Sequence, residues 1–224
     1  MSKRRRTRNK PRPKPVASAD NNNNPLRRRA RLTLQTLEVT RGHDGFLRGK
    51  PEPAVLVAAY RVNGELPASL VGRLLVRVRL QGDMPCSIPL VDRELRYDAR
   101  VGVAERLVML AFAVEENNGE GMAALYAAFE NPGQLLLYNA SESVPSPLTL
   151  GDWAKSSCSP PAARPIETLL GGESLEKIAD SDQFIAACAF SLSAHAKCDD
   201  AWRLPFLGRD ERNDWTLLAR MRVD

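Results

Sequence analysis

The sequence predicts a mainly β protein: a jelly-roll-like β-sandwich with one or two inserted short helices, preceded by a disordered basic arm. Two observations lead to this prediction. Several apolar segments have the lengths and the alternation of strands, whereas few segments show helical spacing. The charge is also divided, because residues 1–31 hold 12 basic side chains and one acidic one, while the rest of the chain holds 20 and 26. We therefore assign residues 1–31 to the arm and residues 32–224 to the sandwich domain.

The arm is nearly free of large apolar side chains. Apart from Met1, only Val16 and Leu26 are larger aliphatic residues, so the arm cannot bury enough surface to offset the entropy of ordering. Its charge comes mainly from arginine, whose planar guanidinium fits phosphate oxygens, and it has no aromatic residue for base stacking. We therefore expect binding to the RNA backbone with little sequence preference and strong salt dependence. The predicted nucleic-acid-binding residues are Lys3, Arg4, Arg5, Arg6, Arg8, Lys10, Arg12, Lys14, Arg27, Arg28, Arg29 and Arg31.

The same arm permits three other interpretations. It has the composition of a solvated tail, of a nuclear-localisation signal and of a patch that binds anionic membranes. The body, in contrast, has no apolar stretch of 18 or more residues, and no apolar core of a signal peptide follows the basic amino terminus. Its cysteines form no CxxC pair, so we expect a reducing compartment such as the cytosol.

The predicted strands follow from alternation and from continuous apolar runs. Residues 54–62 and 106–114 are nearly continuous apolar runs, as in strands buried on both faces, and residues 74–80 alternate between apolar residues and arginine. In residues 32–39 the apolar parity changes after Leu34, which indicates a β-bulge or a break. The remaining predicted strands are residues 134–138, residues 183–193 with Phe184, Ala186, Cys188, Phe190 and Leu192 on one face, and residues 215–223 with Trp215, Leu217, Ala219, Met221 and Val223 on one face.

One helix is predicted at residues 120–130. Met122, Leu125, Tyr126 and Phe129 have the spacing of one helix face, and an Asn-Pro-Gly turn follows. Two further short helices are predicted at residues 165–170 and 173–179, around Gly171-Gly172.

The body shows no catalytic motif. Neither His43 nor His195 lies in a nucleophile motif, and the sequence has no GxSxG, Walker loop or GxGxxG, so we expect neither an enzyme nor a bound cofactor. Cys158, Cys188, His195 and Cys198 are residue types that zinc accepts, but their spacing is not that of a zinc finger. We therefore interpret Cys188 as a buried structural cysteine.

Four acidic residues are candidates for calcium. Asp44 and Glu52 flank a loop, and Glu115 and Glu116 adjoin Asn117-Asn118-Gly119. Adjacent strand residues point to opposite faces, so Glu115 and Glu116 cannot simply act together as two catalytic carboxylates. We expect the pair to lie in a solvated turn at a strand end. No metal site is assigned, and calcium binding by the four acids is left open.

Residues 110–146 combine a strand, a small-residue helix with Ala123-Ala124-Leu125-Tyr126 and Phe129, and an apolar strand ending in Leu136-Leu137-Tyr138-Asn139-Ala140-Ser141-Glu142. With the basic arm, this stretch resembles the capsid (coat) proteins of brome-mosaic-type and cucumber-mosaic-type icosahedral plant RNA viruses. The resemblance implies a jelly-roll shell subunit that self-assembles and packages RNA through its arm. It also implies a location in the virion and in the host cytoplasm.

A second resemblance is to C2 domains. Residues 32–60, LTLQTLEVTRGHDGFLRGKPEPAVLVAAY, look like their first strand, calcium loop and second strand, with Asp44 and Glu52 in place of two aspartates. Glu115 and Glu116 then fall in another calcium loop. This resemblance implies a membrane or protein-interaction module, and it is the alternative to the capsid hypothesis.

Overall fold

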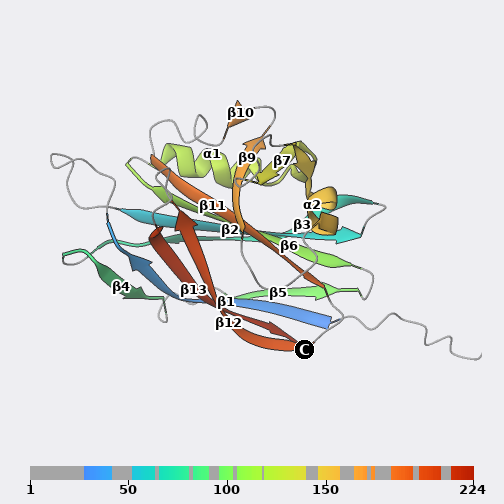
Figure 1. Cartoon of the computed structure of the whole chain (residues 1–224), viewed down its shortest axis with the longest axis horizontal. Coiled ribbons are helices and arrows are strands. Elements are labelled where there is room, and N and C mark those ends of the chain that lie inside the picture. Colours follow the sequence, from blue (N-terminus) through green and yellow to red (C-terminus); the bar gives the residue numbers. More distant parts are fainter. Residues whose placement is uncertain are drawn as a thin grey trace, which may run out of the picture.

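The computed structural model describes residues 28–41, 52–63, 66–80, 83–90, 96–102, 105–117, 119–139, 146–156, 164–170, 173–174, 183–193, 197–207 and 213–224. These residues form two antiparallel sheets that face each other, with two helices on the outer side of one sheet (Figure 1). The predicted fold class, a mainly β sandwich with short inserted helices, is confirmed. Neither of the two helices in these ranges is long and apolar enough to cross a membrane.

The first sheet, sheet A, is centred on β1, which is paired on both sides. β13 lies along one side of β1, and β4 and β5 follow one another along the other side. The strand order is β12-β13-β1-β4, with β5 also paired to β1. The strands of sheet A are β1 (Arg28–Val39), β4 (Cys86–Pro89), β5 (Arg96–Val101), β12 (Cys198–Leu207) and β13 (Asn213–Val223).

The second sheet, sheet B, has the order β3-β2-β6-β11-β9-β7-β8, with β10 paired to β9. β2, β6 and β11 are its central strands, and both faces of them are apolar because each face is covered. The strands of sheet B are β2 (Pro53–Asn63), β3 (Leu66–Arg77), β6 (Arg106–Glu115), β7 (Leu135–Asn139), β8 (Leu148–Thr149), β9 (Arg164–Leu170), β10 (Glu173–Ser174) and β11 (Gln183–Ser193).

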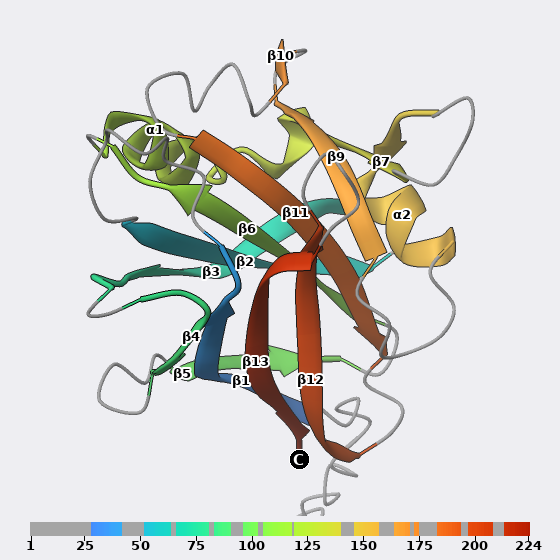
Figure 2. The ribbon, with the colours of Figure 1, turned by 60° about the vertical axis from the view of Figure 1, so that its left-hand side comes forward.

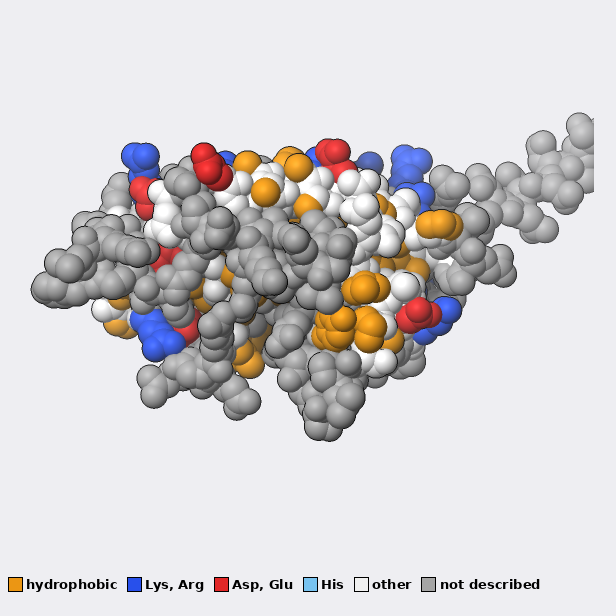
Figure 3. Space-filling view, turned by 90° about the horizontal axis from the view of Figure 1, so that it is seen from above, with side chains coloured by type: hydrophobic (Ala, Val, Ile, Leu, Met, Phe, Trp, Pro, Cys, Tyr) orange, Lys and Arg blue, Asp and Glu red, His pale blue; other side chains and the backbone are white. Residues whose placement is uncertain are grey.

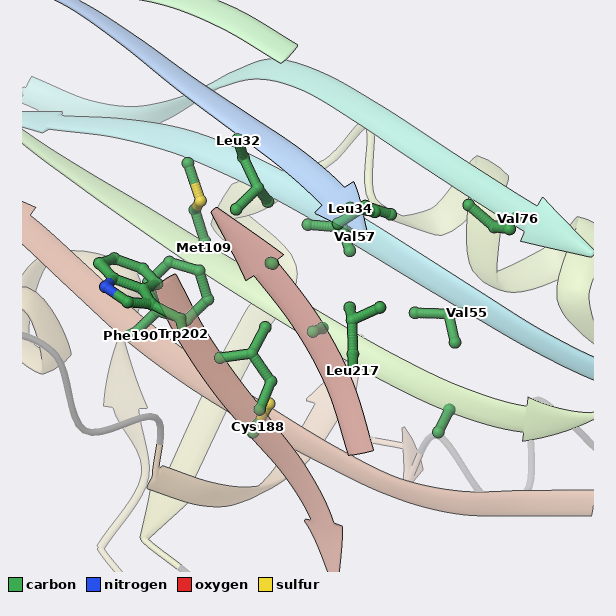
Figure 4. Close-up of a cluster of buried hydrophobic side chains, with 14 of the residues drawn as sticks. Leu32, Leu34, Val55, Val57, Val76, Met109, Cys188, Phe190, Trp202 and Leu217 are labelled. Carbon is green, nitrogen blue, oxygen red and sulfur yellow. The ribbon is translucent and has the colours of Figure 1, made fainter. Parts of the chain in front are cut away.

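One hydrophobic core fills the space between the two sheets. Figure 4 shows Leu32 and Leu217 of sheet A facing Val57 and Met109 of sheet B. The Phe190 ring of sheet B meets the Trp202 ring of sheet A edge to face, with the ring centroids 4.6 Å apart. Aromatic pairs prefer this geometry, so the contact helps to fix how the sheets face each other.

A second core lies between sheet B and the two helices, α1 (Glu120–Ala128) and α2 (Leu150–Ser156), which cover its outer face (Figure 2). The ring of Phe129, just after α1, stacks on the ring of Phe112 of β6, with the ring centroids 4.7 Å apart. Phe112, Phe129 and Trp153 of α2 are all fully buried. The buried Tyr60 hydroxyl donates a hydrogen bond to the Phe129 carbonyl at 3.1 Å, which attaches the end of α1 to β2. A short 3-10 helix, η2 (Pro132–Gln134), leads into β7.

Most predicted elements are present. The seven predicted strands correspond to β1, β2, β3, β6, β7, β11 and β13, and the predicted helix corresponds to α1. The predicted bulge in β1 is confirmed, because its register with β13 shifts between Leu34 and Thr36. In β11 a similar shift lies between Phe184 and Ala186, so Phe184 packs on the helix side instead of sharing the face of Cys188.

Three expectations need correction. Residues 165–170 are not a helix but most of strand β9, because they pair with β11 and β7. In the segment expected to be a helix at 173–179, Glu173–Ser174 form strand β10, and the rest lies outside the described residues. Finally, β1 begins at Arg28, so residues 28–31 belong to the sandwich and not to the arm.

Candidate nucleic-acid interface

The arm joins the folded body at the first residue of β1. Three of the twelve predicted nucleic-acid-binding residues, Arg28, Arg29 and Arg31, therefore lie on a regular strand. The other nine are outside the described residues. The start of β1 lies beside the ends of β5 and β13, at one end of the sandwich (Figure 1).

Strand alternation sorts these three arginines onto two faces. Ala30 and Leu32 point into the core, so Arg28 points toward the space between the sheets, while Arg29 and Arg31 point outward from sheet A. The Arg31 guanidinium already holds a carboxylate, because its Nε lies 2.9 Å from Asp98 Oδ1 on β5. Arg31 is thus a weaker candidate for binding phosphate than Arg29.

Arg29 lies directly opposite another arginine. The register of β1 with β5 pairs Arg29 with Arg100, and both side chains are exposed. Like charges directly opposite one another on neighbouring strands are destabilising. Within the described part of the chain, neither guanidinium makes an ion pair or a side-chain hydrogen bond, so both keep their donors available.

Arg61 of β2 brings a further positive charge to the same end. Its Nη2 donates to the Arg100 carbonyl oxygen at 2.9 Å, and its Nε lies 3.7 Å from Glu105 Oε2. Glu105 in turn accepts a hydrogen bond from the Gly102 backbone N–H at 2.5 Å. We call Arg28, Arg29, Arg61 and Arg100 the arm-root cluster; Glu105 is the acidic side chain in contact with it.

Two nitrogens of the arm-root cluster are buried without a hydrogen bond. They are Nη1 of Arg28 and Nε of Arg61. Both side chains extend from the inward-facing sides of their strands, at the rim of the core that Ala30, Val101 and Leu107 close. Arg61 Nε is nevertheless within ion-pair distance of Glu105, and a buried donor without an acceptor costs free energy.

Four other outward-facing arginines of sheet A, among those whose side chains are described, differ from Arg29 and Arg100, because each holds a carboxylate. Nitrogen–oxygen distances are 2.6 Å for Arg220–Asp199, 2.7 Å for Arg222–Asp224 and 2.9 Å for Arg203–Glu38. The hydrogen bond from Arg220 holds the pKa of Asp199 below its usual value. On the outer face of sheet A, the described arginines without a carboxylate partner are therefore Arg29 and Arg100, at the arm root.

Among the described residues, the helix-covered side of the molecule shows no comparable basic cluster. In the view onto the helix-covered side, the coloured basic and acidic side chains are interspersed with apolar ones, without a continuous basic field (Figure 3). Two arginines of β3 on this side make contacts with neighbouring side chains of the folded body. Arg73 stacks over the Tyr126 ring, 3.9 Å from its centroid, and Arg77 pairs with Glu116.

The acidic residues considered for calcium are not brought together as ligands. Glu116 is held by Arg77, with Nε–Oε distances of 2.8 and 2.7 Å, and both line a hollow of about 480 Å³ together with Glu52. Glu115 is fully buried, because β6 continues through it and is flanked by β2 and β11. The expected solvated turn is therefore wrong for Glu115. Asp44 lies outside the described residues, within which no group of three or more His, Cys, Asp or Glu could hold a metal.

The cysteines do not form a visible metal site either. Cys188 is completely buried in the core between the sheets, as expected, and burial raises its pKa to about 12. Burial also raises the pKa of Cys86 and of Cys198. His43, Cys158, Gly171-Gly172 and His195 lie outside the described residues.

Sequence reasoning missed Arg61 and Arg100 as members of the basic end. Arg61 interrupts the apolar run of β2 near its end, and Arg100 lies in a segment that was not predicted to be a strand. Only the pairing of β5 with β1 places Arg100 beside the arm. The sequence matches no protein-family model, and comparison with curated proteins finds no significant match.

Proposed function

We propose that this chain is a viral capsid protein that self-assembles into a shell and packages RNA through its Arg-rich arm. The observation that carries the proposal is the separation of charge on one scaffold. An arm with nine basic residues in 27 precedes a β-sandwich that holds 23 basic and 26 acidic side chains, and Arg29 and Arg100, which hold no carboxylate among the described residues, lie where the arm begins. The virion and the host cytoplasm are the proposed locations.

The body has the features that a shell subunit needs. It is a two-sheet sandwich with its own cores, so the arm is not required to complete either core. In the described part, β3 and β12 are sheet edges with a single paired neighbour each. Edge strands and sandwich surfaces are common sites of association between identical subunits. The acidic body suits a shell in which the arm supplies the affinity for RNA.

Electron microscopy of the purified protein with and without single-stranded RNA tests assembly. Regular shells support the proposal. A chain that stays monomeric at high concentration and low salt, with RNA present, contradicts it.

RNA affinity is tested with a full-length arm variant in which nine basic residues are replaced by glutamine. The logarithm of the RNA binding constant should fall linearly with the logarithm of salt concentration, by roughly 0.7 per phosphate neutralised on a single strand. The variant should lose most of the RNA affinity. If each of the nine replaced charges binds one phosphate, the slope of the salt dependence should fall by up to about 6. Unchanged affinity would contradict the role of the arm. The replaced residues are Lys3, Arg4, Arg5, Arg6, Arg8, Lys10, Arg12, Lys14 and Arg27.

The C2-like module remains the alternative, and calcium distinguishes it. Its calcium loops require oxygen ligands that converge from separate loops, whereas Glu116 is held by Arg77 and Glu115 points into the protein. We expect calorimetry to detect no calcium binding tighter than the millimolar range. Micromolar binding that Asp44→Asn abolishes would favour the C2-like alternative.

A further inference from the structure

We propose that the arm-root cluster is a phosphate-binding site on the folded body, which holds the RNA backbone at the point where the arm leaves the sandwich. This inference rests on the proposed packaging of RNA and extends it. It places part of the interface on regular β-structure, where side-chain positions are fixed by strand register. The residues that bind are Arg29 and Arg100, supported by Arg28 and Arg61.

The first argument is the pairing of Arg29 with Arg100. Directly opposite residues on antiparallel strands have Cβ atoms about 5 Å apart, so two cationic heads project side by side from sheet A. A phosphate between them offsets their repulsion and accepts hydrogen bonds from both, as guanidinium groups favour. The pair is thus pre-arranged for an anion with several oxygens.

The second argument is the contrast with the other arginines on the same face. Arg31, Arg203, Arg220 and Arg222 each hold a carboxylate, but Arg29 and Arg100 hold none among the described residues. Before a phosphate could bind to any of the four arginines that hold a carboxylate, that ion pair would have to break. At Arg29 and Arg100 no ion pair has to break, so none of the binding free energy of a phosphate is spent on displacing a carboxylate.

The third argument is that Arg61 holds the backbone of Arg100 in place. Arg61 Nη2 binds the carbonyl oxygen of Arg100, which fixes the backbone that carries the Arg100 side chain. The buried, unsatisfied nitrogens of Arg28 and Arg61 add positive potential at the same rim. Among the described residues, Glu105 contacts Arg61, and Asp224, whose backbone N–H donates to the Arg29 carbonyl oxygen at 3.0 Å, holds Arg222. These two carboxylates do not neutralise four arginines.

The chemistry and the position favour nucleic acid over other polyanions. RNA bound along the arm reaches β1 at Arg28, so the next phosphates meet Arg29 and Arg100. The outward-facing side chains described on sheet A include no aromatic residue for stacking on bases. The site should therefore read the phosphodiester backbone and not the base sequence.

The test compares two full-length double variants. R29A/R100A removes the two available arginines, and R203A/R220A removes two ion-paired arginines from the same face, with the same change in net charge. Binding to a fluorescent oligouridine is measured from low to high salt. For R29A/R100A we expect the slope to fall by about 0.7, for the one phosphate that the two arginines share, whereas the control should keep the wild-type slope. R29K/R100K should restore most of the slope, because lysine retains the charge.

The outcomes separate this inference from the proposed function. If both double variants behave alike while the glutamine variant of the arm loses affinity, the arm-root site is refuted and RNA packaging stands. If the wild-type chain does not bind RNA, both proposals fail. If R29A/R100A weakens binding to anionic phospholipid vesicles but not to RNA, the site binds membranes and the inference is overturned.

A second measurement uses the unmodified wild-type protein and does not depend on how the variants fold. Phenylglyoxal modification is mapped by mass spectrometry with and without oligouridine. Arg29 and Arg100 should be modified in the free protein and protected by RNA, while the exposed Arg203 should react equally in both states. Equal protection at all three positions, or at none, would overturn the inference.

Discussion

A partly buried ion pair joins the end of β1 to the start of β13, and its two members should contribute unequally to stability. Arg41 binds Asp214 with two hydrogen bonds, of 2.5 Å from Nε and 3.1 Å from Nη2. The Asp214 side chain is 2% exposed, whereas that of Arg41 is 42% exposed. Two more hydrogen bonds reinforce the junction: the Thr40 backbone N–H donates to the Asp214 carbonyl oxygen at 2.7 Å, and the Trp215 indole Nε1 donates to the Arg41 carbonyl oxygen at 3.0 Å.

The asymmetry in burial sets the expected magnitudes. Arg41→Ala removes the arginine that holds a buried carboxylate, which should cost about 2–3 kcal/mol of unfolding free energy, because water can take part of the place of the half-exposed guanidinium. Asp214→Asn keeps a hydrogen-bonding side chain and leaves an arginine that can turn to water, so about 1–2 kcal/mol should be lost. The double variant should lose little more than Asp214→Asn alone, because the buried charge responsible for the larger loss is gone.

Urea unfolding, followed by tryptophan fluorescence without RNA, measures these differences. Trp153, Trp202 and Trp215 are all buried, so their emission reports the exposure of both cores. Arg203→Ala is the control, because its pair with Glu38 is solvent-exposed and should contribute less than about 1 kcal/mol. Additive losses in the double variant, or a larger loss from Asp214→Asn than from Arg41→Ala, would refute this reasoning.

Two further predictions concern α2 and the core between the sheets. Thr149 Oγ1 accepts the Asp152 backbone N–H at 3.2 Å and donates to Asp152 Oδ2 at 2.8 Å, so Thr149→Ala should cost about 1 kcal/mol in urea unfolding. The Thr149 hydroxyl lowers the pKa of Asp152, so an NMR titration of the same variant should show that pKa rise, and an unchanged pKa would contradict the geometry. Because burial raises the pKa of Cys188 to about 12, iodoacetamide at pH 8 should modify it only after unfolding. Peptide mass spectrometry that finds Cys188 labelled as fast as Cys86 in the native protein would refute this packing.

Strand patterns predicted the centre of the sandwich well, because burial there is strong and periodic. β2, β6 and β13 show it: their apolar residues face packed layers, so period-two alternation or a continuous apolar run marks each of them. β12 has the same alternation at Trp202, Leu204 and Phe206. It was not predicted as a strand, because Pro205 and the acidic residues at its start are unfavourable in strands. Pro205 is tolerated because β12 is an edge strand that pairs only with β13.

The errors arise where the environment of a segment comes from distant parts of the chain. Residues 165–170 form a strand because β11 and β7 supply partners on both sides, which local propensity cannot reveal. Glu115 is buried because β2 and β11 both flank the end of β6. The same limit applies to the candidate site, since the opposition of Arg29 and Arg100 depends on a register between strands some 70 residues apart.

The position of β1 explains how one strand can serve both the body and the arm. β1 is hydrogen-bonded to β13 on one side and to β4 and β5 on the other, so it is a central strand of sheet A. Displacing β1 would break hydrogen-bond ladders on both of its sides, whereas displacing an edge strand would break one ladder. The inward Ala30, Leu32 and Leu34 add buried apolar contacts to the same strand. Under the proposed function, attachment at a central strand would therefore let the arm bind RNA without unfolding the sandwich, while the same strand holds Arg29 beside Arg100.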